Sequence, residues 1–164
     1  GPLGVGYLSV TSEYIFNTLP YPLLTLHLGN QSPIYSSITY NLMNYGEFVS
    51  DRYTSLQYRQ YLEGFLLNRI PLLNKLKWRL LATSNVIVGG LRESNRKLIS
   101  EFTPDGQQTL TAGYFKNGKP YIELGYGVEN IFKFLRVDFV HRVSYLENKD
   151  TRKFGILFTA QFQL

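Results

Sequence analysis

The sequence contains no cysteine, which excludes disulfide bonds, thiolate metal sites and cysteine nucleophiles. It also lacks any run approaching the roughly 18 uninterrupted apolar residues of a transmembrane helix, so only strands could cross a membrane. Charged residues make up 18% of the chain, below the usual share of about a quarter. The net charge of +5 is scattered along the sequence. With no basic face or recognisable module, we expect no nucleic-acid binding.

Aromatic residues are plentiful instead. The 164 residues, one domain's worth of chain, include 13 Tyr and 11 Phe. The aromatic girdles and polar lumen faces of an outer-membrane β-barrel would give this composition. A tyrosine-rich soluble β-sandwich would give it equally well, so composition leaves both classes open.

Alternating side chains near the C-terminus predict two strands, because every second residue of a strand shares a face. The first strand has one face with Leu135, Val137, Phe139, His141, Val143 and Tyr145. Its other face has Arg136, Asp138, Val140, Arg142 and Ser144. The second has the apolar row Phe154, Ile156, Phe158, Ala160, Phe162 and Leu164. Strands of about 9–11 residues with one aromatic-rich and one polar face are typical of a transmembrane β-barrel.

The same alternation predicts seven strands in all, at 5–16, 23–28, 50–66, 76–88, 121–128, 135–145 and 154–164. Short turns are predicted at one end of these strands, at Asn17, Asn68 and Asn130. Long loops at 29–46, 91–119 and 147–153 are predicted at the other end, as in outer-membrane barrels. Such barrels normally have an even number of strands, so we expect the remaining strands to come from upstream sequence or a second chain.

Several blocks are more specific than the alternation. LEGFLLNRIP at 62–71 with LKWRL at 76–80, and GYGVENIFKFLRVD at 125–138 with FQL at 162–164, resemble the end of the bacterial surface-antigen superfamily of outer-membrane barrels. That superfamily contains the barrel-assembly and two-partner-secretion pores. YNLMNYGEF at 40–48, DRY at 51–53 and PYIE at 120–123 resemble its members that carry an N-terminal carboxypeptidase-regulatory-like domain.

The resemblance implies that 5–164 is the C-terminal portion of a barrel of about sixteen strands. Residues 1–4 resemble the remnant of a cleaved tag, and since no signal peptide is present, a barrel implies that the native start has been removed. The resemblance also implies an Arg-Gly-aromatic motif in the loop at 29–46. No arginine precedes Gly46 there, so the chain departs from the superfamily's pattern at this motif, and the resemblance alone does not imply the superfamily's insertion or translocation mechanism.

Ionisable residues of a membrane strand avoid lipid, so the polar rows predict a lumen charge ladder that holds register between strands. Its members are Glu13, His27, Arg59, Glu63, Lys77, Arg79, Glu123, Arg136, Asp138 and Arg142. A selectivity or gating surface is the alternative for these residues. The row Phe158, Ala160, Phe162 and Leu164 resembles the C-terminal signal read by the outer-membrane insertion machinery.

Catalysis is not expected, because Ser144 and His141 point to opposite faces of a strand and no Gly-x-Ser-x-Gly element occurs. His27 and His141 have no visible co-ligands, so we expect neither a metal nor another cofactor.

We therefore expect an outer-membrane β-barrel protein of a gram-negative cell, acting as a scaffold, a pore or a component of an assembly or translocation complex. Its expected partners are outer-membrane lipid, the insertion machinery and other outer-membrane or periplasmic subunits. A soluble tyrosine-rich binding module is the alternative, and an outer-membrane barrel enzyme is the third reading.

Overall fold

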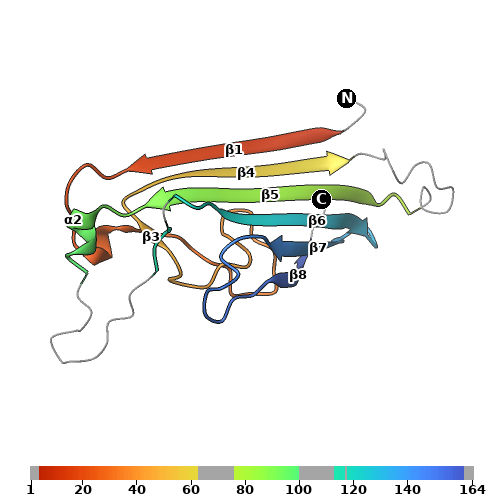
Figure 1. The fold of residues 1–164 in the computed structure, drawn as a ribbon. Helices are drawn as coiled ribbons and strands as arrows, with labels where there is room; N and C mark the ends of the chain where they lie inside the picture. Colours follow the sequence, from red (N-terminus) through yellow and green to blue (C-terminus); the bar gives the residue numbers. More distant parts are fainter. Residues whose placement is uncertain (1–3, 63–75, 100–112, 117, 161–164) are drawn as a thin grey trace.

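A computed structural model describes residues 4–62, 76–99, 113–116 and 118–160, and one antiparallel sheet dominates it (Figure 1). The strand order is β1-β4-β5-β6-β7-β8. Their bounds are β1 Val5–Tyr14, β4 Arg52–Leu62, β5 Arg79–Gly90, β6 Tyr121–Ile131, β7 Leu135–Arg142 and β8 Phe154–Ala160. A small second sheet pairs β2 (Thr25–Leu26) with β3 (Val49–Ser50). The prediction of an all-β, antiparallel protein is confirmed for this part of the chain.

Helix is scarce in the described residues. It is limited to the 3-10 turn η1 (Tyr21–Leu23) and the single-turn α2 (Glu93–Arg96). No helix in these parts of the chain is long and apolar enough to span a membrane.

Each strand of the main sheet pairs with the strand that neighbours it in the meander. The β1–β4 pairing runs from Val5 opposite Tyr61 to Tyr14 opposite Arg52. β4 in turn pairs with β5 over its whole length. The long connections, at 15–51, 91–120 and 143–153, all join strands at the same end of the sheet (Figure 1). The hairpin between β6 and β7 closes at the opposite end, where Asn130, Phe132 and Lys133 have positive φ.

The predicted strand count of seven is wrong for the described residues, since the main sheet has six. Of the segment predicted as a strand at 23–28, only Thr25–Leu26 is a strand, and it pairs with β3 outside the main sheet. Asn17 therefore lies at the long-loop end, opposite to the Asn130 turn. Pro20 and Pro22 follow the end of β1 as expected, but they open a long connection instead of a tight turn. The predicted turn at Asn68 lies outside the described residues.

The sheet is open in the part of the chain that the structure describes. β1 and β8 stand at its two edges, and every residue of β1 is exposed. A seven-stranded piece of a barrel was expected; the structure has an open sheet of six strands.

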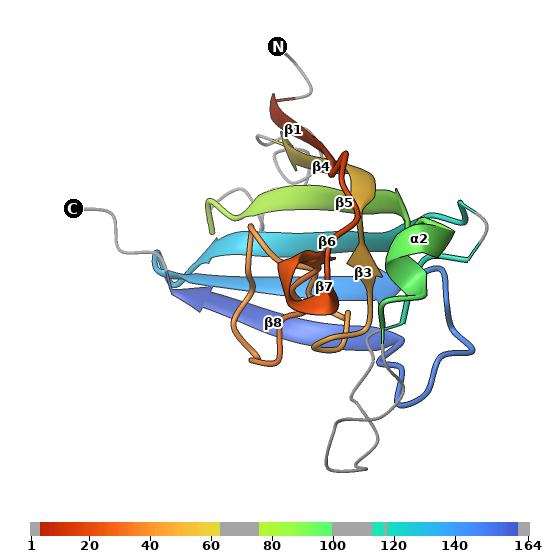
Figure 2. The same ribbon diagram turned by 90° about the vertical axis from the view of Figure 1, so that its left-hand side faces the viewer.

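The chain between β2 and β3 folds back onto one face of the sheet (Figure 2). We call residues 27–48 the covering loop and this face the inner face. Tyr40, Met43 and Phe48 of the loop pack against Ile87 and Tyr121 of β5 and β6. Leu42 packs separately against Val140 and Leu157. These contacts make the core, so the hydrophobic centre lies between the loop and the sheet.

The predicted strand at 135–145 is longer than the strand in the structure. β7 ends at Arg142, and Tyr145 has a φ of 53° that turns its side chain inward, where it is buried in the same core. Val143 remains exposed. The sequence alternation places Val143 and Tyr145 on one face, but one is exposed and the other buried, because the strand ends before them.

Candidate functional site: the buried polar face and its covering loop

The two faces of the sheet differ sharply in chemistry. On the outer face, Leu8, Val10, Tyr126, Ile156 and Phe158 are exposed by 63%, 59%, 55%, 46% and 45% of their surface. Among the residues of β1 and β4–β8, every Lys, Arg, Asp and Glu except Arg52 lies on the inner face. Arg52 is the first residue of β4, at the long-loop end. Apolar groups are thus exposed on the outer face, and five charged residues of the inner face are buried, namely Glu123, Glu129, Arg136, Asp138 and Arg142. This is the reverse of a water-soluble sheet.

Arg142 is one of the enclosed charges on the inner face. Its guanidinium makes a two-pronged ion pair with Glu47 of the covering loop, at 2.8 and 2.6 Å, and its side chain is 0% exposed. It also donates to the Tyr145 carbonyl at 2.7 Å and lies over the Tyr121 ring at 4.8 Å. Because paired charges in this geometry hold their partners in one orientation, Arg142 fixes the loop against β7.

Glu47 has a pKa below its ordinary value. Burial raises the pKa of this carboxyl, but hydrogen bonds from Arg142, from the Asn44 amide and from Asn148 outweigh that effect. Glu47 is therefore ionised at neutral pH, and its contribution to stability is lost only as pH falls below 4.5.

Glu123 of β6 holds the covering loop at a second point. Its carboxylate accepts the backbone amides of Asn41 at 2.9 Å and Leu42 at 2.7 Å. The Tyr121 hydroxyl donates to the same carboxylate at 2.6 Å. Glu123 and Arg142 are directly opposite in the β6–β7 register, yet both direct their polar atoms at the loop. The two residues therefore clamp the loop from adjacent strands.

Tyr35 joins the loop to distant strands. Arg136 of β7 lies over its ring at 4.6 Å and Arg59 of β4 at 5.4 Å. Arg136 also pairs with Asp138 through two hydrogen bonds of 2.7 Å. Because β5 and β6 separate β4 from β7, two guanidiniums converging on one ring from these strands fit a concave inner face.

The remaining predicted ladder residues occupy varied positions. Arg79 pairs across the strands with Glu129 at 2.8 Å, and Glu13, near the end of β1, accepts a hydrogen bond from Thr25. Lys77 is exposed in the turn before β5. Ala160 ends β8 beside Phe158 on the outer face. Glu63, Phe162 and Leu164 lie outside the described residues.

The structure thus brings together the ladder residues mainly through the loop. One cross-strand rung is present among the described residues, Arg79 with Glu129, whereas Arg136 and Asp138 share a strand. Glu47, Glu129 and Asp51 were missed by the alternation. Asp51 accepts the Arg92 backbone amide and guanidinium, each at 2.9 Å, and the Asn95 amide at 2.6 Å. All three fall within the quoted resemblance blocks, Glu47 at 40–48, Asp51 at 51–53 and Glu129 at 125–138, which was the available signal.

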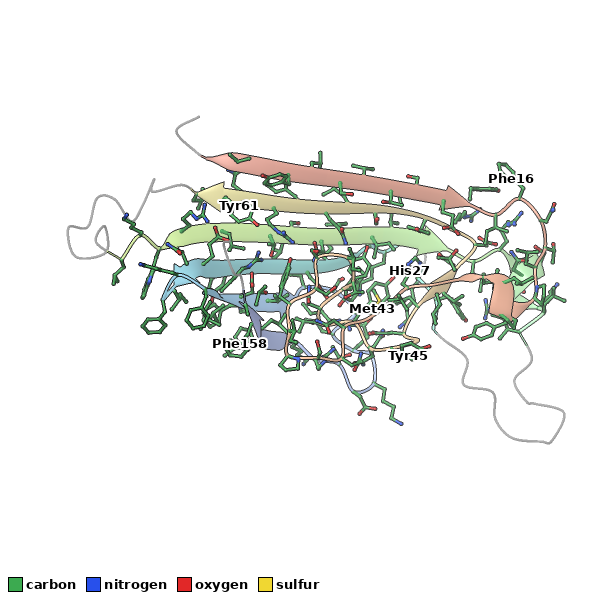
Figure 3. The ribbon with its side chains drawn as sticks, turned by 180° about the vertical axis from the view of Figure 1, so that it is seen from behind. Phe16, His27, Met43, Tyr45, Tyr61 and Phe158 are labelled. Atoms are coloured by element: carbon green, nitrogen blue, oxygen red, sulfur yellow. The ribbon has the colours of Figure 1, made fainter. Side chains whose placement is uncertain are left out.

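His27 does not stand in a strand of the main sheet. It follows β2 at the start of the covering loop, buried between the rings of Tyr53 at 4.7 Å and Phe115 at 5.4 Å (Figure 3). Its Nε2 shares a hydrogen bond of 2.7 Å with the Ser50 hydroxyl. Burial lowers the pKa of His27 to about 4, so the ring is neutral at physiological pH. In the described residues no group of three or more His, Cys, Asp or Glu is placed to hold a metal ion.

The burial of His27 predicts an acid-sensitive step in stability. Between the ordinary pKa of 6.5 and the lowered value of about 4, His27 is protonated in the unfolded chain and neutral in the folded chain. Above pH 6.5 His27 costs the folded state nothing, and below pH 6.5 the free energy of unfolding falls as the pH drops. We expect a loss of about 2 kcal/mol between pH 7.5 and 5, from 1.36 kcal/mol per pKa unit. Chemical unfolding at both values measures it. His27→Gln should remove this step, and an identical pH dependence in the variant would contradict the assignment.

Comparison with known families gives one match. The model of the C-terminal domain of a family of unknown function, DUF5686, matches residues 20–94. That segment contains the covering loop, β4 and β5. No curated protein and no solved structure gave a match.

Proposed function

We propose that this chain is part of an outer-membrane β-barrel whose outer face contacts lipid and whose interior is filled by the covering loop. In this role the protein is a membrane scaffold or a component of an outer-membrane complex. The observation that carries the proposal is the inverted sheet, with apolar side chains exposed on one face and most of the charged side chains on the other, where five of them are buried.

The outer face supports contact with hydrocarbon. Rows of side chains cross the sheet from strand to strand, such as Val10, Leu56, Val86 and Ile122. A second row, ending in Val137 and Phe158, crosses β4 to β8. No described segment packs over these rows. An apolar surface that crosses the sheet from strand to strand is unfavourable in water and is expected where lipid or another protein covers it.

The inner face supports a filled interior over an open channel. Leu42 and Met43 of the covering loop are almost entirely buried against the sheet. The clamps at Arg142 and Glu123 hold the loop there through ion pairing and backbone hydrogen bonds. Opening a wide water path would require breaking both, so a scaffold is favoured over a pore.

Membrane extraction of the protein from the cells that make it tests the proposal. We expect the protein to sediment with the outer membrane, to stay there after washing with alkaline buffer or urea, and to need detergent to remain dispersed. A lipid-facing surface predicts all three, because removing lipid exposes the apolar rows to water. A protein that is monodisperse without any amphiphile would refute the proposal and favour a soluble binding module.

A further inference from the structure

A cavity lies at the long-loop end of the sheet, where β4 begins and β5 ends. Its volume is about 540 Å³, and it is formed by the sheet, by α2 and by the chain that precedes β6. The lining includes Arg52 of β4, Arg96 of α2 and Lys116, together with Tyr114 and Phe115. Three basic residues from three separate segments therefore converge on one space.

The charge of this cavity is not balanced by its own lining. No carboxylate lines it in the part of the chain that the structure describes. Arg96 reaches Glu93 at 3.7 Å. Lys116 reaches Glu147 at 3.8 Å. All four side chains are more than half exposed, and ion pairs of this length between exposed groups contribute little. Arg52 makes no ion pair with any described residue. An anion would neutralise this excess of positive charge.

Arg52 connects the cavity to the outer face. Its side chain starts on that face, opposite Gly90 of β5. A Cβ atom added to Gly90 would lie 3.1 Å from the Arg52 Nε, so the missing side chain leaves room for the guanidinium. A recess of about 450 Å³ shares Arg52 and Gly90 with the cavity. Val88 of the outer face lines this recess, and so does Glu13, whose carboxylate accepts a hydrogen bond from Thr25. Arg52 thus lies between a basic cavity and the apolar outer face.

Aromatic residues surround Arg52 at this level of the sheet. Tyr14 lies opposite Arg52 in the β1–β4 register. Phe16 follows the end of β1, and the rings of Tyr14 and Phe16 are exposed and 4.9 Å apart (Figure 3). Toward the middle of the sheet the outer face is apolar, as at Leu56 and Val86. Tyrosine is enriched where hydrocarbon meets water, and basic residues near that level attract anionic headgroups. In the proposed barrel Arg52 is therefore at the membrane–water boundary.

We propose that this cavity binds the phosphate of a lipid headgroup in the leaflet at the long-loop end of the sheet. The inference rests on the proposed contact of the outer face with lipid. Guanidinium and ammonium groups hold phosphate through charge-assisted hydrogen bonds, and Arg52 and Arg96 can each donate two in parallel. The acyl chains then lie on the outer face beside Val88, a contact that an inorganic phosphate ion does not make. The adjoining basic and apolar surfaces thus favour a phosphorylated lipid.

Two lipids that differ only in the phosphate test the ligand. Phosphatidic acid and diacylglycerol with the same acyl chains are titrated into the intact protein in neutral detergent, and native mass spectrometry measures the lipid bound. We expect phosphatidic acid to bind roughly a hundredfold more tightly, from the summed attraction of three cations. Inorganic phosphate at the same concentration should not displace it. Equal binding of the two lipids, or displacement by inorganic phosphate, would overturn the proposal.

Removal of two cations tests the location of the site. Arg52→Gln/Arg96→Gln should weaken the binding of phosphatidic acid about thirtyfold. The matched pair Lys77→Gln/Lys133→Gln removes the same charge at the opposite end of the sheet, before β5 and in the β6–β7 hairpin, and should leave binding unchanged. Equal weakening by both pairs would make the effect one of net charge. No weakening by the first pair would place the lipid elsewhere. Either result contradicts the proposed site.

Lysine labelling of the unaltered protein covers the case in which Arg52→Gln/Arg96→Gln fails to assemble. Lys116 and Lys77 are both exposed. Phosphatidic acid should slow the acetylation of Lys116 several-fold and leave Lys77 unchanged, whereas diacylglycerol should slow neither. A Lys116 that reacts at the same rate with both lipids would refute the site.

The site and the proposed function can fail separately. A protein that needs detergent but does not distinguish the two lipids keeps the proposed membrane role and loses only the phosphate site. A protein that is monodisperse without amphiphile fails the proposed function itself, and the lipid site fails with it.

Discussion

Replacing Arg142 with methionine should lower the free energy of unfolding by about 3–5 kcal/mol, the cost of leaving one partner of a buried ion pair uncompensated. Methionine preserves much of the side-chain volume, so the loss comes from Glu47, which is 8% exposed and would keep its charge without its partner. Three loop and turn carbonyls, at Leu42, Ser144 and Tyr145, would also lose their donor. Urea unfolding in detergent measures the change.

The double variant Arg142→Met/Glu47→Gln is the matched control. Removing the stranded carboxylate should recover part of the loss, since a neutral amide is cheaper to bury than an unpaired charge. An Arg142→Met variant that unfolds at the same urea concentration as the unaltered protein would show that the loop is not held by this pair. A double variant that is less stable than the single one would assign the effect to packing at Glu47 instead.

Leu56→Arg should lower stability in a bilayer by about 2–4 kcal/mol, as lipid-facing arginines near the middle of a barrel do. Leu56 lies near the centre of β4 on the outer face, between Val10 and Val86. Reversible unfolding in lipid vesicles measures the cost, and the fraction of protein assembled in the outer membrane should fall in parallel.

Leu98→Arg provides the matched control for Leu56→Arg. Leu98 follows α2 and is 50% exposed, against 38% for Leu56, so both leucines have much of their surface open. In a water-soluble protein both substitutions would change stability by less than about 0.5 kcal/mol. A cost at Leu56 without one at Leu98 identifies the outer face as lipid-exposed. Equal and small effects would contradict the proposed membrane location.

The faces of the strands were predictable from the sequence because alternation is a local property. The predicted split of Val137 and Phe139 from Arg136 and Asp138 is confirmed in β7, where the two charged residues are buried on the inner face. One residue of shift would reverse every side chain, so a long alternating segment determines its own orientation.

The path of the covering loop was not predictable in this way. The contacts that fix it join residues far apart in the chain, such as Asn41 with Glu123 and Glu47 with Arg142. Nothing local distinguishes a loop that projects into solvent from one that folds onto a sheet. The same limit explains the error at Asn17, because a proline-containing break looks alike in a tight turn and at the start of a long connection.

The pairing of inner-face charges has an electrical consequence for the interior. Filters that choose among ions do so with rings of unopposed charge or with bare carbonyl oxygens. Here the guanidiniums of Arg79, Arg136 and Arg142 each face a carboxylate, at Glu129, Asp138 and Glu47. Around these three pairs the electrostatic potential is therefore largely cancelled over short distances, and in the proposed barrel a small ion beside them would have little preference for either sign.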